Sequence, residues 1–184
     1  MKVPLKAEEA VKRIFEFNAQ TIDTGTVNGI PFLGTCGFGF DAHIAKKFDD
    51  FHKRGFISYI RLVIREYSSY SPMVFSCKAD GQLSEKELAI CSIANSSQFG
   101  NGFVISPLSD VNDGKFELIQ ISRFKMINAL TVVRRFFNKS IHKSKYFESM
   151  SFSKEAHLKV KDQTEVLFHL DGEPLLGGNE FAIN

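Results

Sequence analysis

Two carboxylates near the end of the chain are the side chains best suited to chemistry. Asp171 and Glu173 flank Gly172 and precede Pro174. Acidic residues are rarely buried without a partner, so a pair at a turn is better suited to accepting a proton or binding a cation than to filling a core. Taken alone, the motif is more often an ordinary acidic turn, in which Asp171 accepts backbone hydrogen bonds and Glu173 is solvated.

The residues before this pair alternate in the manner of a β-strand. One face would carry Val166, Phe168 and Leu170, and the other Glu165, Leu167 and His169. Pro174 and then Gly177-Gly178 predict the end of this strand. We therefore expect Asp171 and Glu173 to lie in a turn at a strand end.

The rest of the chain predicts strands interrupted by helices. Periodicity and turn signals indicate helices at about 7–15, 42–51, 56–67 and 124–137, and strands at about 21–23, 30–36, 73–78, 88–94, 103–105, 116–121, 155–161, 164–170 and 180–183. Asn28-Gly29 and Asp162-Gln163 predict two-residue hairpins, and Asp80-Gly81 predicts a turn followed by a polar segment. Asp41 is expected as the N-cap of the second helix. The pattern predicts a mainly β, α+β fold: one antiparallel β-sandwich-like domain over residues 1–184 with inserted helices.

The composition is that of a folded protein without crosslinks. Of the 184 residues, 43% are hydrophobic and 24% charged, which excludes a disordered chain. Nineteen Phe and no Trp suggest a Phe-rich core or an apolar cleft. Cys36, Cys77 and Cys91 are odd in number and lie in apolar runs, so we expect buried free thiols in a reducing compartment. With no signal peptide and no long apolar run, the sequence predicts a cytoplasmic protein.

Basic residues gather in one segment. Between residues 123 and 145 there are seven Lys or Arg side chains and no acid. Such a block favours an anionic partner, although a solvated helix face balanced by acids elsewhere is an equal alternative. The segment contains no nucleic-acid-binding motif, and its interleaved apolar residues fit a helix on an anionic membrane surface better. We expect no nucleic acid as a partner.

Several other chemistries find no support. The five histidines are scattered and do not form an HExxH pattern, and no GxSxG segment indicates a hydrolase. No Walker-type or GxGxxG phosphate-binding loop occurs.

Three segments in a fixed order carry a family resemblance. They are Gly37–Ala42, then Pro107 followed by 112–118, and finally 170–173, with the Asn-Gly hairpin just upstream. In this order they resemble the C-terminal part of the diacylglycerol kinase catalytic family, which includes sphingosine kinases and bacterial lipid kinases. The resemblance covers nearly the whole chain. It implies the substrate-binding half of a lipid kinase, a sandwich domain shared with NAD kinases, and a lipid hydroxyl on diacylglycerol or a sphingoid base as phosphoryl acceptor.

The resemblance also implies roles for individual residues. Glu173 would be the catalytic base, with Asp171 beside it. A Mg²⁺ ion would be bound by the side chain of Asp113 and by main-chain carbonyls near Asp110 and Lys115. ATP would be held by an N-terminal domain with a Gly-Gly-Asp-Gly-Thr motif that does not occur in this chain, so the chain alone is expected to be a poor kinase. The helix within about residues 1–18 would connect to that domain.

Two other functions remain open at this stage. The chain could be a non-catalytic lipid-binding or oligomerisation module, and a homodimer is then one expected state. It could also be a relative that phosphorylates NAD or another nucleotide. Peripheral membrane attachment is compatible both with a lipid-binding module and with a lipid kinase.

Overall fold

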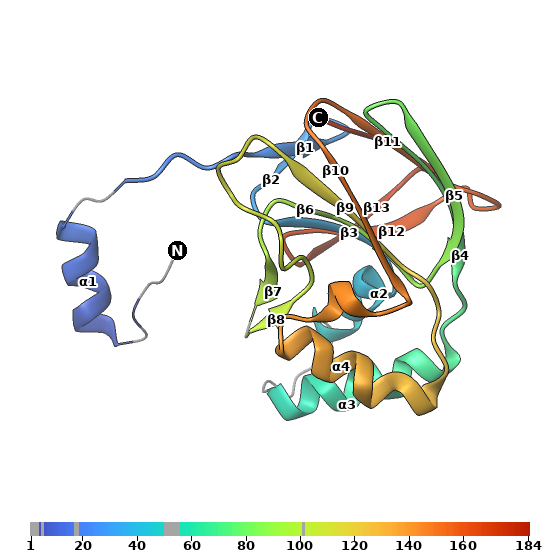
Figure 1. Cartoon of the computed structure of the whole chain (residues 1–184), viewed down its shortest axis with the longest axis horizontal. Helices are drawn as coiled ribbons and strands as arrows, with labels where there is room; N and C mark the ends of the chain where they lie inside the picture. The colour runs from blue at the N-terminus through green and yellow to red at the C-terminus, as the bar shows by residue number, and fades with distance from the viewer. Residues whose placement is uncertain (1–3, 5, 17–18, 50–55, 101) are drawn as a thin grey trace.

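Two antiparallel sheets form the body of the molecule (Figure 1). The computed structural model describes residue 4 and residues 6–16, 19–49, 56–100 and 102–184. In spatial order, the first sheet contains β2 (Ile30–Phe32), β1 (Gly25–Val27), β14 (Glu180–Ile183), β11 (Ala156–Val160), β4 (Met73–Ala79) and β5 (Gln82–Leu88). The second contains β10 (Phe147–Phe152), β9 (Phe116–Ile121), β6 (Ile90–Ala94), β3 (Thr35–Gly39), β12 (Val166–Leu170) and β13 (Glu173–Gly177). A small ribbon pairs β7 (Gln98–Gly100) with β8 (Phe103–Val104).

A Phe-rich core lies between the two sheets. The rings of Phe38 and Phe168, from the second sheet, lie 4.7 and 5.2 Å from that of Phe181 on the first. Such aromatic contacts add to the free energy gained by removing apolar area from water. The sandwich-like fold and the Phe-rich core predicted from the sequence are thereby confirmed.

Helices cover the other face of the second sheet (Figure 1). They are α2 (Phe40–Asp49), α3 (Phe56–Ser69), α4 (Ala129–Phe137) and the short 3-10 turns η1 (Met126–Asn128) and η2 (Ile141–Lys143). Buried residues of these helices and of β6 and β9 form a second apolar cluster. Because both faces of this sheet are covered, β3 and β6 are buried along their whole length instead of alternating. This second cluster surrounds the candidate site.

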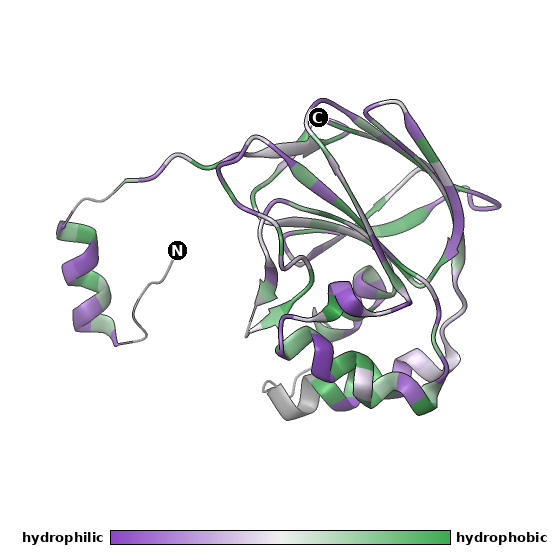
Figure 2. Cartoon of the chain, viewed as in Figure 1, coloured by the Kyte–Doolittle hydropathy of each residue, from purple (hydrophilic) through white to green (hydrophobic). Residues whose placement is uncertain are grey.

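The first helix stands apart from the sandwich. Helix α1 (Ala7–Phe15) was predicted correctly, and none of its residues, all of which the structure describes, is buried. Its apolar side chains Ile14 and Phe15 are 70% and 83% exposed, and Figure 2 shows its hydrophobic and hydrophilic residues around a helix that stands away from both sheets. The connection of this helix to a further domain stays a prediction, and residues 1–3, 5 and 17–18 lie outside the described part.

Two of the three local turn predictions were correct. Asn28-Gly29 and Asp80-Gly81 each join paired strands, and all four residues have positive φ, as a type I′ hairpin requires. The polar segment after Asp80-Gly81 is itself a strand, β5, at the edge of the first sheet. Its polar side chains fit an edge position, where one side of the strand faces solvent.

Other sequence predictions were wrong. The strands at 155–161 and 164–170 form no hairpin, because β11 pairs with β14 and β4 whereas β12 pairs with β3 and β13 in the other sheet. Residues 21–23 are not a strand, and β7, β10 and β13 were not foreseen. The fourth predicted helix begins at Ala129 instead of 124, after the short 3-10 turn η1. The alternating pattern of a strand does not say which neighbour it pairs with, so these errors concern partners more than propensities.

The start and end of α2 also differ from the prediction. The helix begins at Phe40, so Asp41 lies inside its first turn and is not the N-cap. The predicted end near residue 51 lies outside the described residues. The side chain of Asp41 points instead toward β6 and β12, where it makes the contacts described below.

Candidate active site

The Asp171-Gly172 turn joins β12 and β13. Leu170 pairs with Glu173, and Asp171 and Gly172 have φ of 51° and 94°. Two positive φ values define a type I′ turn, for which Asp-Gly is a favoured sequence. The strand predicted at 164–170 ends at Leu170 as expected, and after the turn Pro174 lies in the unpredicted strand β13, where it is tolerated because β13 is the edge strand of its sheet.

The carboxylate of Asp171 is held by backbone amides. Oδ2 accepts a hydrogen bond from the N–H of Leu33 at 2.8 Å, and Oδ1 accepts from those of Gly34 at 2.7 Å and Thr35 at 2.9 Å. The N–H of Asp171 donates in return to the carbonyl of Thr35 at 2.8 Å. These bonds fix the turn against the bend between β2 and β3.

A second Asp-Gly turn in the molecule has the same arrangement. The carboxylate of Asp80 accepts from the backbone N–H groups of Ser153, Lys154 and Glu155, and these bonds lower the pKa of its carboxyl group. Asp80 does not line the cavity described below. An Asp-Gly turn bound by three amides is therefore a structural arrangement in this fold, and at Asp171 the same geometry leaves the exposed Glu173 as the carboxylate that does not bind these amides.

A buried carboxylate and imidazole lie beside this turn. Nε2 of His169 is 3.4 Å from Oδ2 of Asp41, and the two side chains are only 4% and 8% exposed. Nδ1 of His169 accepts the N–H of Gly172 at 3.3 Å, so in the neutral ring the proton is on Nε2, directed at Asp41. The hydroxyl of Ser92 donates to the same Oδ2. His169 thus connects the Asp-Gly-Glu turn to the first turn of α2.

The backbone of β3 makes room for this pair. Gly37 lies opposite both Ser92 and His169 in the sheet. A Cβ atom at this position would overlap the carboxylate of Asp41 and the ring of His169. A glycine here is therefore a requirement of the close approach between the strand and the two side chains.

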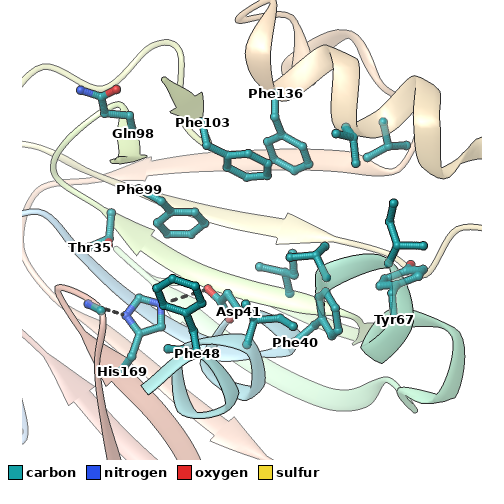
Figure 3. A pocket seen from close by; sticks show the side chains of 18 of the residues that line it. Thr35, Phe40, Asp41, Phe48, Tyr67, Gln98, Phe99, Phe103, Phe136 and His169 are labelled. Carbon is teal, nitrogen blue, oxygen red and sulfur yellow. Dashed lines mark hydrogen bonds and ion pairs between the residues drawn. The ribbon is translucent and has the colours of Figure 1, made fainter. Parts of the chain in front are cut away.

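A cavity of about 570 Å³ connects these residues to an apolar interior. At one end it is lined by Asp171, Gly172 and Glu173, and it continues past Asp41 and His169 between the helices α2, α3 and α4. Figure 3 shows Phe99, Phe103 and Phe136 on one side of it and Phe40 and Phe48 on the other. The volume is that of a small-molecule site, and the lining is mostly apolar with the acidic turn at one end.

His169 was placed on the strand face shared with Glu165 and Leu167, with no partner predicted for it. That face is covered by α2 and the cavity, and the histidine is buried. Nothing in the local sequence could have paired it with Asp41, because the two residues are distant in the chain and belong to different elements. Asn95 was missed as well: its Nδ2 donates to the carbonyls of Asp23 and Leu33 at 2.6 and 2.8 Å, and so supports the bend that Asp171 binds.

The predicted Mg²⁺ ligands lie in the loop before β9. Asp110, Asp113 and Lys115 are exposed and do not line the cavity. Oδ1 of Asp113 accepts the N–H of Lys115 at 3.0 Å, and Asp23 holds the loop through the N–H of Gly114 at 2.8 Å. Within the described residues, no group of three or more His, Cys, Asp or Glu side chains could hold a metal ion. One carboxylate and a few main-chain carbonyl groups provide too few ligands by themselves, so a Mg²⁺ ion bound here would keep several of its waters.

Comparison with known proteins identifies the domain. The family model described as the YegS C-terminal NAD kinase beta sandwich-like domain matches residues 34–179. The chain belongs to this family. The matched range of the YegS C-terminal domain begins at the Gly34 bend that Asp171 binds and includes every residue of the turn and of the Asp41–His169 pair.

Relatives agree with this assignment. A protein of Yersinia pestis (strain Pestoides F) named "Probable lipid kinase YegS-like" is 28% identical over 181 residues, which are 95% of this chain and 58% of that protein. The crystal structure of a diacylglycerol kinase from Bacillus anthracis str. Sterne matches with a TM-score of 0.63 at 18% identity, over 99% of this chain and 56% of that one. The chain thus spans less than two thirds of these proteins, and the resemblance to the C-terminal part of lipid kinases is confirmed.

None of the helices in the part of the YegS C-terminal domain that the structure describes is long and apolar enough to cross a membrane.

Proposed function

We propose that this chain is the substrate-binding half of a lipid kinase that transfers the γ-phosphoryl group of ATP to a lipid hydroxyl. The observation that supports this most is the cavity, whose lining has an exposed glutamate at one end and is otherwise mostly apolar. A lipid has the same division into a polar head and apolar chains. A nucleotide substrate, as in NAD phosphorylation, would bury charged phosphates in the Phe-lined part, which is unfavourable.

In the proposed reaction the lipid hydroxyl lies at the acidic end of the cavity, with the acyl chain among the phenylalanines. Glu173 accepts the hydroxyl proton while the lipid oxygen bonds to the γ-phosphorus and the bond to the β-phosphate oxygen breaks, releasing ADP. Asp171 takes no proton in this scheme. It holds the turn through the amides of Leu33, Gly34 and Thr35, so that the position of Glu173 is fixed before the lipid binds.

The remaining components come from outside the cavity. ATP would be bound by a domain that this chain does not contain, since the sequence has no glycine-rich phosphate-binding loop. Mg²⁺ would be bound through Asp113 and carbonyls near Asp110 and Lys115, where hard oxygen donors suit it and water completes its coordination. Alone, the 184-residue chain would then bind lipid without phosphorylating it.

The direct test replaces Glu173 with Gln in the longest protein that the gene encodes. With diacylglycerol and sphingosine in mixed micelles, Glu173→Gln should lower kcat by about 10²–10⁴-fold with little change in the KM for lipid, because a general base contributes about that much. Glu165→Gln is the matched control, since this exposed glutamate lies directly before β12, at the end of the β12–β13 hairpin opposite to the turn. Activity of Glu173→Gln within a few-fold of the wild type would remove Glu173 from the mechanism.

The cavity by itself would also suit a non-catalytic lipid-binding module, the second candidate. Saturable binding of a fluorescent lipid without phosphorylation by the full protein would favour this module over the kinase. Absence of both lipid binding and phosphorylation would contradict both functions.

A further inference from the structure

The buried Asp41–His169 pair lines the cavity but has no task in the proposed reaction. Removing a carboxylate and an imidazole from water costs free energy, and well-packed apolar side chains in such positions often leave a protein equally stable. The cavity wall around the pair is mostly apolar. Stability alone therefore does not account for the pair, and titratable groups buried beside a cleft are candidates for a functional role.

The amide of Gly172 depends on His169 for a partner. In a two-residue type I′ hairpin, the second turn residue directs its N–H away from the strand ladder. Asp171, the first turn residue, donates its N–H to the carbonyl of Thr35. The N–H of Gly172 donates instead to Nδ1 of His169 at 3.3 Å. The peptide group between Asp171 and Gly172, one residue before Glu173, is thus held by the histidine.

The ring of His169 is fixed from several sides. Phe99 meets it edge-on, with the ring centroids 5.9 Å apart (Figure 3), and Gly37 lies so close that a Cβ there would overlap Nε2. Nε2 is directed at the carboxylate of Asp41, 3.4 Å away. A carboxylate at one ring nitrogen keeps the proton on that nitrogen, so the other remains an acceptor. Asp41 thus favours the tautomer that the amide of Gly172 requires.

The same two contacts argue against His169 as the proton acceptor of the reaction. One ring nitrogen accepts the amide of Gly172 and the other carries a proton toward Asp41, so neither has a free lone pair for a lipid hydroxyl. Glu173, which is exposed and lines the cavity, has this capacity. The pair can therefore act on the reaction only through the position of its neighbours.

We propose that Asp41 and His169 are positioning residues for Glu173. His169 holds the amide of Gly172, and Asp41 keeps His169 in the tautomer that can do so. The role of Glu173 rests on the proposed function, whereas the hold on Gly172 does not. Because a displacement of about 1 Å can cost about 10²-fold in rate, loss of this hold should lower kcat. Lipid binding should change little, since most of the cavity lining remains.

Three substitutions at His169 separate positioning from other roles in the longest protein that the gene encodes. His169→Leu removes both ring contacts and should lower kcat by about 10–100-fold, while the KM for diacylglycerol in mixed micelles changes by less than about two-fold. His169→Asn keeps an acceptor in the place of Nδ1 and should restore kcat to within a few-fold of the wild type. His169→Gln keeps only a donor toward Asp41 and should resemble His169→Leu. Both amides bury the same polar group, so desolvation does not explain a difference between them.

NMR of the 184-residue chain tests the contacts without any activity. The His169 ring should have an unprotonated Nδ1 and a protonated Nε2, and the Gly172 amide should be protected from exchange with solvent. Exchange should accelerate by about ten-fold in His169→Leu and remain slow in His169→Asn, because only the second keeps the hydrogen bond. Asp41→Asn should make a second ring tautomer detectable, since an amide can face Nε2 with its oxygen or its nitrogen.

His157→Leu is the matched control. Nε2 of His157 lies 3.7 Å from a carboxylate oxygen of Glu155 on the first sheet, away from the cavity lining, so this change should alter neither kcat nor the exchange of Gly172. An unchanged kcat in His169→Leu would overturn the proposal. Equal losses in His169→Asn and His169→Gln, or a proton on Nδ1 in the wild type, would overturn it as well. If the wild type phosphorylates no lipid, the proposed function fails, and the exchange rates alone decide whether His169 holds the turn.

Discussion

Asp171 and Glu173 lie two positions apart and have different environments. The oxygens of Asp171 accept three backbone amides, whereas the exposed Glu173 begins an edge strand at the end of the cavity. A carboxylate whose oxygens already accept several backbone amides is fixed in place and can hold its neighbours in position. The chemistry we propose for Glu173 thus depends on Asp171 being occupied elsewhere.

Replacement of Asp171 should reveal its structural contribution. Asp171→Ala removes the acceptors for Leu33, Gly34 and Thr35 and places a less tolerant residue at positive φ, so we expect a loss of about 1–2 kcal/mol in the free energy of unfolding. Asp171→Asn should lose less, because Asn keeps one acceptor and tolerates this φ. Urea unfolding measures both. Asp162→Ala is the control for the backbone, since Asp162 has φ of 57°, and an equal loss there would assign the whole effect to conformation.

At the scale of elements, three parts of the chain meet at one point of β3. Helix α2 brings Asp41 and strand β12 brings His169 into the space that a side chain at Gly37 would occupy, and strand β6 brings Ser92, which donates to Asp41. Because His169 also accepts the amide of Gly172, the packing of α2 is connected to the position of the Asp171-Gly172 turn. The site therefore depends on how these elements approach each other as well as on its own residues.

Gly37→Ala tests this close approach. The added methyl group must displace the Asp41 carboxylate or the His169 ring, and such overpacking typically costs about 1–3 kcal/mol. We expect a lower thermal midpoint together with a shifted NMR signal of the His169 ring. Gly178→Ala is the matched control, because no heavy atom lies within 4 Å of a Cβ there. An unchanged midpoint and histidine signal would show that β3 has room for a side chain at this position.

At the scale of the whole molecule, the sandwich encloses all three cysteines. Cys77 on the first sheet and Cys91 on the second face each other with their Sγ atoms 3.8 Å apart, and Cys36 lies buried in the second sheet. Burial raises the pKa of the thiols of Cys36 and Cys91. The thiolate is the reactive form, so Cys36 and Cys91 are protected by both burial and protonation. Cys77, whose pKa is lowered by its hydrogen bond with Cys91, is protected by burial alone.

Thiol labelling should therefore report global unfolding. With a disulfide reagent at neutral pH, the native protein should react far more slowly than the protein in urea, where three thiols become available. The labelling rate should follow the unfolding equilibrium as urea is raised. Ser149→Cys, an exposed position on β10, should react at once and shows that the reagent is active. Rapid native labelling of the wild type would mean that the two sheets separate locally.

The sequence determined what depends on neighbouring residues. The Asn28-Gly29 and Asp80-Gly81 hairpins, the helix at α1 and the strand before Asp171 follow from local backbone preferences and periodicity. The mainly β sandwich with a Phe-rich interior follows from the same patterns taken together. The ordered motifs also indicated the family, because each is a short segment whose residues can be recognised without knowing their partners.

Only the tertiary structure decided which segments meet. It placed β11 and β12 in different sheets. It also turned the strand face that carries His169 toward the cavity and brought Asp41 of α2 next to this histidine. It also gave Asp171 its three amide partners. Alternation and turn propensity fix the conformation of a segment but leave its neighbours open, and neighbours are chosen by the packing of the whole chain. The carboxylates could be found in the sequence, and their separate roles came from what lies against each of them.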